Sequence, residues 1–239
     1  MKLYFTIIII LILSSCNQQE DDLKVDINNT KDVEISKNKT DGINVINELN
    51  DVGFFNITDT IMLEKVKQEM ILSYEKYNYF GSLTKEESLE YFDNRFFSVD
   101  QEELFELGGL TKNLEKVKKT FNLLGLKLNY SNENNNEASF NSESNHWKHT
   151  IELNNKEYIA FDGEMDENSW ATATINFTNM LNDQLALQGS EEQVYIIYSG
   201  NDGMLVFLTP EMFKIVEKYY PDDYNRPMSS EKWKEYNKI

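Results

Sequence analysis

Cysteine is nearly absent from this chain of 239 residues, and Cys16 is the only one. A single cysteine excludes a disulfide bond within the chain, and with it the disulfide-rich scaffolds common among small exported domains. Stability must therefore come from a hydrophobic core. The composition allows one, because 40% of the residues are hydrophobic and 13% are aromatic, as in globular proteins rather than disordered ones.

Basic residues are scarce as well. The chain has 23 Lys and Arg against 41 Asp and Glu, a formal net charge of −18. This charge argues against nucleic acid as a partner, because phosphates require a basic surface. It also argues against a helix lying flat on anionic lipid. A basic protein partner, or divalent cations, would be favoured instead.

Long apolar runs are missing except at the start of the chain. Lys2 precedes an apolar run from Ile7 to Leu13, which Ser14, Ser15 and Cys16 follow. The run is too short to span a bilayer, since a transmembrane helix needs about 20 apolar residues. A charged start, a short apolar middle and small residues before a cysteine resemble the signal segment of bacterial lipoproteins. The resemblance covers only these residues, and we recognise no family for the rest of the chain.

The resemblance implies that residues 1–15 are a signal peptide and that Cys16 carries diacylglycerol in a lipid bilayer. Asn17 follows the cysteine where aspartate would retain a lipoprotein in the inner membrane. We therefore expect an outer-membrane lipoprotein of the cell envelope, either periplasmic or surface-exposed. Residues 16–50, acidic and without aromatics, are expected to form a flexible tether.

Apolar residues at helical spacing predict a helical unit over residues 51–128. We expect four short helices there, opened by the polar residues 58–60, 84–87, 98–101 and Thr111. Gly125 stands where a helix terminator with positive φ is favoured. Residues 129–145 are polar and rich in asparagine, and this low-complexity composition predicts a linker.

The periodicity changes over residues 146–239, for which we predict an α+β domain of order ββαββα. Residues 150–161 indicate a hairpin with a tight polar turn at Asn154, Asn155 and Lys156. Trp170 and the apolar residues after it predict a helix over about 169–187. Two apolar strands, 194–198 and 205–208, flank the turn residues 200–203, and helices capped by Thr209 and by Ser229 or Ser230 follow. This order predicts one antiparallel sheet packed against helices.

The only two histidines, His146 and His149, are candidate zinc ligands. Asp162 or Glu152 would complete such a site. The spacing differs from that of catalytic zinc helices, and strand alternation would direct the two imidazoles to opposite faces. A solvated strand edge is the other interpretation.

A second candidate metal site lies in an acidic stretch whose alternate residues carry oxygen ligands, as in the first half of a calcium loop. These residues are Asp162, Glu164, Asp166 and Asn168. The pattern then departs from a calcium loop, because Glu167 occupies the sixth position and Ala173 the twelfth. The alternative is an acidic loop at a helix N-terminus, where negative charge is favoured.

The tyrosines Tyr219, Tyr220 and Tyr224 follow the expected helix after Thr209 and could form an exposed contact patch. Packing of this segment onto the sheet is the alternative. No Gly-x-Ser-x-Gly motif occurs in the chain, and no nucleophile triad is supported.

We expect a lipid-anchored envelope protein that binds a protein partner without catalysis, such as an inhibitor or immunity-like module, and that needs no cofactor. Acidic inhibitors gain association rate from electrostatic steering toward basic partners. Two alternatives stay open. One is a metal-assisted hydrolase of envelope polymers using His146 and His149, and the other is a carbohydrate-binding or structural envelope component.

The expected anchor predicts that mass spectrometry of the mature protein finds Cys16 as the first residue, carrying the mass of acyl chains. Cys16→Ala should release the protein from the membrane fraction, because the thiol is the attachment point. An unmodified Cys16, or an initiating methionine still in place, would contradict the predicted location.

Overall fold

A computed structural model describes residues 39–85, 90–105, 109–135, 140–141, 143–198, 203–221 and 226–239. These residues belong to one compact unit, Lys37–Ile239. The expected signal peptide, Cys16 and most of the expected tether lie outside the described residues. None of the helices in the described ranges has the length and apolar character that a membrane span requires.

The fold is α+β, as the sequence predicts. The first half contains α1 (Lys39–Asp51), the 3-10 helix η1 (Phe54–Ile57), α2 (Leu63–Tyr77), β1 (Phe96–Val99), α3 (Gln101–Phe105) and α4 (Gly109–Leu123). The second half contains β2 (Tyr130–Asn134), β3 (Phe140–Asn141), β4 (His146–Leu153), β5 (Lys156–Glu164), α5 (Ser169–Leu187), β6 (Gln193–Tyr198), β7 (Gly203–Leu208), α6 (Pro210–Tyr219) and α7 (Ser230–Asn237). From β4 to α6 the order ββαββα is confirmed.

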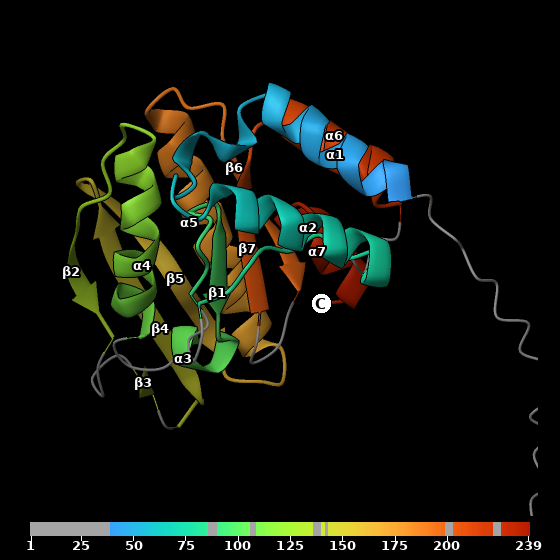
Figure 1. Cartoon of the computed structure of the whole chain (residues 1–239). Helices are drawn as coiled ribbons and strands as arrows, with labels where there is room; N and C mark the ends of the chain where they lie inside the picture. Colours follow the sequence, from blue (N-terminus) through green and yellow to red (C-terminus); the bar gives the residue numbers. More distant parts are fainter. Residues whose placement is uncertain are drawn as a thin grey trace, which may run out of the picture. The chain divides into compact units, whose positions relative to one another are not determined.

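The strands form two antiparallel sheets rather than the single sheet we expected. One sheet has the order β1-β7-β6. In the other, β5 pairs with one edge of β4, while β2 and β3 pair with different parts of its opposite edge. The two hairpins, β4–β5 and β6–β7, do not pair with each other because α5 packs against both β5 and β6. Figure 1 shows α4 on the near side of these strands and α1 beside α6.

The sheet β1-β7-β6 is buried on both faces. Along β6, Val194 and Ile196 join a core with α4 and α5, while Tyr195 and Ile197 join a second core with α1, α2 and α6. All six residues of β7 are buried. A strand covered on both faces is apolar throughout instead of alternating, which explains the unbroken apolar runs of these two strands.

Helix α1 occupies the last part of the range in which we expected a flexible tether. Its residues Val45, Ile46 and Leu49 are almost completely buried, and the helix contacts α2 and α6. The prediction rested on the average polarity of residues 16–50 and overlooked this short apolar stripe. Three apolar side chains at helical spacing are enough to pack an amphipathic helix onto a core. The tether prediction is therefore corrected for residues 39–50.

The segment from Thr84 to Val99 also differs from the prediction. In place of a second helix, Thr84 forms an antiparallel bridge with Tyr91, while residues 86–89 lie outside the described ranges. Phe96–Val99 forms β1 and pairs with β7, and the expected third helix begins after this strand, as α3 at Gln101. The residues expected as a separate helical unit thus contribute a strand to the C-terminal sheet.

The polar residues 129–145, expected as a linker, contain β2 and β3. Tyr130 and Ser131 pair with Leu153 and Glu152, and a bulge follows before Asn134. Ladder hydrogen bonds use backbone groups, so the asparagine-rich composition does not prevent pairing with β4 of the β4–β5 hairpin. Residues 136–139 and 142 lie outside the described ranges.

Several local signals in the sequence are confirmed. Gly125 has φ 74° and follows the end of α4, where Leu126 N donates to Phe121 O at 2.8 Å. Asn154 and Asn155 have φ values of 47° and 68°, the left-handed pair that a two-residue hairpin turn requires. The hydroxyls of Thr209 and Ser229 each accept a backbone N–H at the start of α6 and α7.

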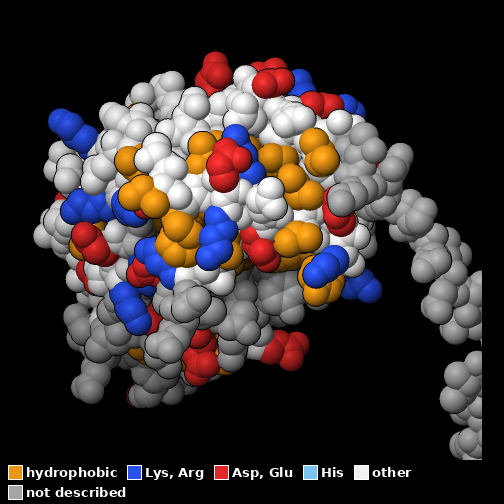
Figure 2. Space-filling model, in the orientation of Figure 1, with side chains coloured by type: hydrophobic (Ala, Val, Ile, Leu, Met, Phe, Trp, Pro, Cys, Tyr) orange, Lys and Arg blue, Asp and Glu red, His pale blue; other side chains and the backbone are white. Residues whose placement is uncertain are grey.

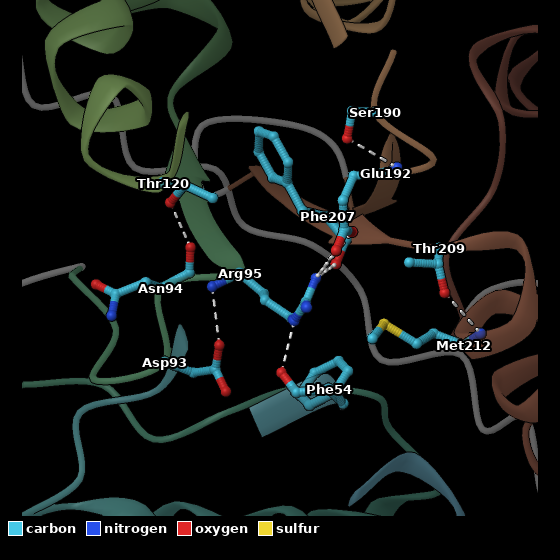
Figure 3. A network of polar contacts seen from close by, with 10 residues as sticks. All are labelled: Phe54, Asp93, Asn94, Arg95, Thr120, Ser190, Glu192, Phe207, Thr209 and Met212. Carbon is cyan, nitrogen blue, oxygen red and sulfur yellow. Dashed lines mark hydrogen bonds and ion pairs between the residues drawn. The ribbon is translucent and has the colours of Figure 1, made fainter. Parts of the chain in front are cut away.

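A buried arginine connects the two halves of the fold (Figure 3). Arg95, 2% exposed, directs Nη1 to both carboxylate oxygens of Glu192 at 2.8 Å. Its Nε donates to Phe54 O at 2.6 Å, and Nη1 also donates to Phe207 O at 3.1 Å. The side chain therefore joins η1, β7 and the residue before β6. Asp93 adds a further link, since its carboxylate accepts hydrogen bonds from Thr58 and from the Arg95 N–H, each at 2.8 Å.

We predict that Arg95→Met lowers the free energy of unfolding by about 3–5 kcal/mol, because it leaves the buried Glu192 carboxylate without its cation. The double variant Arg95→Met with Glu192→Leu should recover part of this loss, since no buried charge remains. Urea denaturation measures both. A loss below about 1 kcal/mol for the single variant, which is the range of solvent-exposed ion pairs, would contradict a buried structural role.

Candidate functional site

The two histidines lie on opposite faces of β4. His146 Nε2 is 2.9 Å from Asp162 Oδ1 on the outer face, where the His146 side chain is 39% exposed. His149 is buried, and its Nε2 lies 2.9 Å from Glu133 Oε1 on β2. The structure thus brings His146 to Asp162 but turns His149 toward another strand, as the alternation along the strand predicted.

The candidate calcium ligands do not form a curled loop. Asp162 and Glu164 belong to β5, with exposed side chains on an extended backbone. Asp166 Oδ1 accepts hydrogen bonds from Asn168 N–H at 2.8 Å and from the Ser169 hydroxyl at 3.2 Å. This arrangement orders the chain before α5. Within the described ranges, no group of three or more His, Cys, Asp or Glu side chains is placed to hold a metal ion.

The tyrosine patch needs a correction. Tyr220 is completely buried between Tyr74 and Phe80, whose ring centroids lie 5.1 and 5.3 Å away, and burial raises the pKa of its phenol. Tyr219 is half-buried, and its hydroxyl donates to Glu48 on α1 at 2.6 Å. Tyr224 lies outside the described residues. Packing of this segment onto the core, the alternative interpretation, describes Tyr220.

The outer face of the β4–β5 hairpin gathers acidic side chains, and we call it the acidic strand face. Alternation along the strands and the cross-strand register give its members. They are Glu152, Glu157, Asp162 and Glu164, together with Ile159, which is 50% exposed. Lys148 lies on the same face, 3.7 Å from Asp162 Oδ2. Acids therefore outnumber bases on this face.

Two of these acids face each other directly, because Glu152 is the cross-strand partner of Glu157. Like charges at directly opposed positions of an antiparallel pair destabilise it. Within the part of the chain that the structure describes, Glu152 receives one long hydrogen bond, 3.4 Å, from the Ser131 hydroxyl. The pair is thus a local cost to folding, next to an exposed isoleucine.

A cleft of about 500 Å³ lies between α4 and the segment that leads into β1. We call it the lysine cleft, because its rim carries Lys112, Lys116 and Lys119 from α4 and Lys85 from the opposite wall. Phe96, Phe97 and Tyr91 contribute its apolar lining. Figure 2 shows Lys and Arg side chains interspersed with Asp and Glu side chains beside hydrophobic ones on this face.

The acidic side chains of the lysine cleft have partners within the protein. Glu103 contacts the ammonium groups of Lys112 and, at 3.5 Å, of Lys116, and the Lys112 hydrogen bond lowers the pKa of Glu103. Glu90 lies 2.6 Å from Lys85 Nζ, which lowers the pKa of Glu90. Each of these acids is neutralised by a neighbouring lysine.

Two of the remaining three acids accept hydrogen bonds. Glu115 accepts the Tyr130 hydroxyl at 2.8 Å, and Asp100 accepts the backbone N–H groups of Glu102 and Glu103 at the start of α3. Lys119 differs from them. The charge of Lys119 helps to lower the pKa of Glu90. Among the described residues, however, Lys119 has no direct hydrogen bond or ion pair.

Sequence reasoning missed the lysine cleft although part of its signal was present. Lys112, Lys116 and Lys119 are spaced i, i+4 and i+7 on a helix that the sequence predicted, so they share one face. The opposite wall was not predictable, because residues 84–92 were assigned to a helix.

Asp93 lines the inner end of the lysine cleft and is completely buried. Burial raises the pKa of this carboxyl, against the lowering effect of its hydrogen bonds from Arg95 N–H and Thr58. Folding therefore makes ionisation of Asp93 less favourable than it is in the unfolded chain. As pH rises from the ordinary value of 3.8 through the higher folded value, ionisation of Asp93 reduces stability.

We predict that Asp93→Asn, which preserves the shape and removes the charge, is more stable than the unmodified protein at neutral pH. The advantage should grow as pH rises from about 4, near the ordinary pKa of aspartate, and level off above the folded pKa of Asp93. Urea unfolding across this range measures it. A difference between the two proteins that does not change with pH would contradict the raised pKa.

No family model, no curated protein and no solved structure matches this chain. Fold likeness therefore supplies no activity or substrate. The functional conclusion depends on the two surfaces described above, the acidic strand face and the lysine cleft.

Proposed function

We propose that this protein is a lipid-anchored, non-catalytic binding module of the cell envelope that engages a basic protein partner through the acidic strand face. The observation that carries the proposal is the opposed pair Glu152 and Glu157 beside the exposed Ile159. An acidic rim around an apolar residue offers both charge and contact area to a partner.

Energetics supports a binding role for this pair. Opposed carboxylates repel each other in the free protein, and a lysine or arginine placed between them would relieve the repulsion. A partner that carries such a group would gain association rate from the surrounding acidic field. The repulsion that destabilises the free protein would thus favour formation of the complex.

The anchor expected at Cys16 fits the same proposal. A tethered module meets partners that enter the envelope while remaining at the membrane. An acidic body avoids electrostatic adsorption to anionic lipid, so the acidic strand face would stay available to a protein.

The proposal predicts that the immobilised protein captures a basic protein from an envelope extract at low salt and that Glu152→Gln with Glu157→Gln slows this association by about tenfold, since steering charges act mainly on the association rate. Surface plasmon resonance at several salt concentrations measures the rate. The same double variant should unfold at a slightly higher urea concentration, because the repulsion is gone.

The matched control is Glu64→Gln with Glu231→Gln, which removes the same number of charges from exposed positions on α2 and α7. It should slow association much less. If both double variants slowed association equally, the loss of rate would come from the net charge alone. That result would contradict the assignment of the acidic strand face as the binding surface. Failure to capture any protein at low salt would contradict the binding function itself.

A further inference from the structure

We propose that the lysine cleft is a binding site for a small amphipathic anion. One carboxylate or phosphate group would be held by Lys119 and Lys116, and an apolar body would lie against the aromatic lining. This site is separate from the acidic strand face and goes beyond the proposed protein-binding function.

The size and lining of the cleft suit such a ligand. Its volume of about 500 Å³ falls within the range of about 300–1,000 Å³ typical of small-molecule sites. Phe97 and Tyr91 provide aromatic surface, and polar groups occupy the rim. Small-molecule sites commonly combine a mainly apolar lining with a few polar groups that fix orientation.

One lysine of the cleft is free of a direct partner among the described residues and can receive an anionic group. Glu90 and Glu103 form ion pairs with lysines of the cleft, and Glu115 lies 3.7 Å from Lys118. Asp100 accepts backbone N–H groups, and Asp93 is buried. Lys119 keeps its ammonium without a direct partner among the described residues, and Lys116 has one ion pair, at 3.5 Å. Lys119 is therefore the cation of the cleft that is open to a ligand, although the acids of the lining outnumber its lysines five to four.

The two lysines are also well placed for a shared anion. They lie three residues apart on α4, so both side chains extend from one face of a regular helix. Side chains that bind a ligand are held more precisely on a helix than on a loop. Lysine binds carboxylate and phosphate as a point charge and needs no fixed fork geometry, which suits a ligand whose main recognition comes from its apolar body.

The test uses decanoate as the anionic probe and decan-1-ol as the neutral molecule of the same chain length. Isothermal titration calorimetry measures affinity, and amide chemical shifts locate the ligand. Vesicles of phosphatidylglycerol, compared with vesicles of phosphatidylcholine, show whether a lipid headgroup can supply the same anion.

We expect decanoate to bind with shifts confined to the residues of the lysine cleft and decan-1-ol to bind much more weakly. Lys119→Gln should weaken decanoate binding by about tenfold or more, which corresponds to about 1.4 kcal/mol. Lys116→Gln should weaken it less. Lys118→Gln is the matched control, because Lys118 neighbours Lys119 but pairs with Glu115 at 3.7 Å and does not line the cleft.

Binding of decanoate without vesicle binding would assign the site to a free amphiphile, and binding of both would extend it to anionic lipid. Three results would overturn the proposal: no decanoate binding at millimolar concentration, equal binding of decan-1-ol, or unchanged affinity in Lys119→Gln. Protein capture by the acidic strand face can be measured in the same variants, so the two proposals fail independently.

Discussion

The buried ion pair between Arg95 and Glu192 is the interaction on which the arrangement of this fold depends. One guanidinium holds a carboxylate, the carbonyl of Phe54 and the carbonyl of Phe207. Glu192 lies directly before β6, Phe54 belongs to η1, and Phe207 belongs to β7. A buried charge must be paired and hydrogen-bonded to be tolerated, so the three segments have little freedom to move apart while Arg95 stays covered.

Both candidate surfaces follow from this constraint and from the sheets. Arg95 immediately precedes β1, and its neighbours Asp93 and Asn94 line the lysine cleft, so the position of one cleft wall depends on the ion pair. The acidic strand face belongs to the other sheet, where α5 covers the inner side of β5 and leaves the outer side to charged residues. The surface proposed for a basic partner and the cleft proposed for an anion thus lie on different parts of the fold.

Local chemistry predicted much of this fold, and long-range pairing explains what it did not predict. Gly125, the Asn154–Asn155 turn and the Thr209 cap act within a few residues, so sequence alone identified them. The pairing of β1 with β7 joins residues more than a hundred positions apart, and no local pattern around Phe96 reveals it. Of the candidate site residues, the opposed faces of His146 and His149 were predictable from alternation. The burial of Tyr220 was not, because it depends on packing against Tyr74 and Phe80.

Native-state hydrogen exchange tests the central claim, that Arg95 makes the N-terminal helices and the sheet β1-β7-β6 one cooperative unit. We predict that the slowest amides of α2, β1 and β6 share one opening free energy and converge on the same denaturant dependence. If α2 and β1 opened together at a clearly lower free energy while β6 stayed protected, the two halves would be independent and the account given for Arg95 would be contradicted.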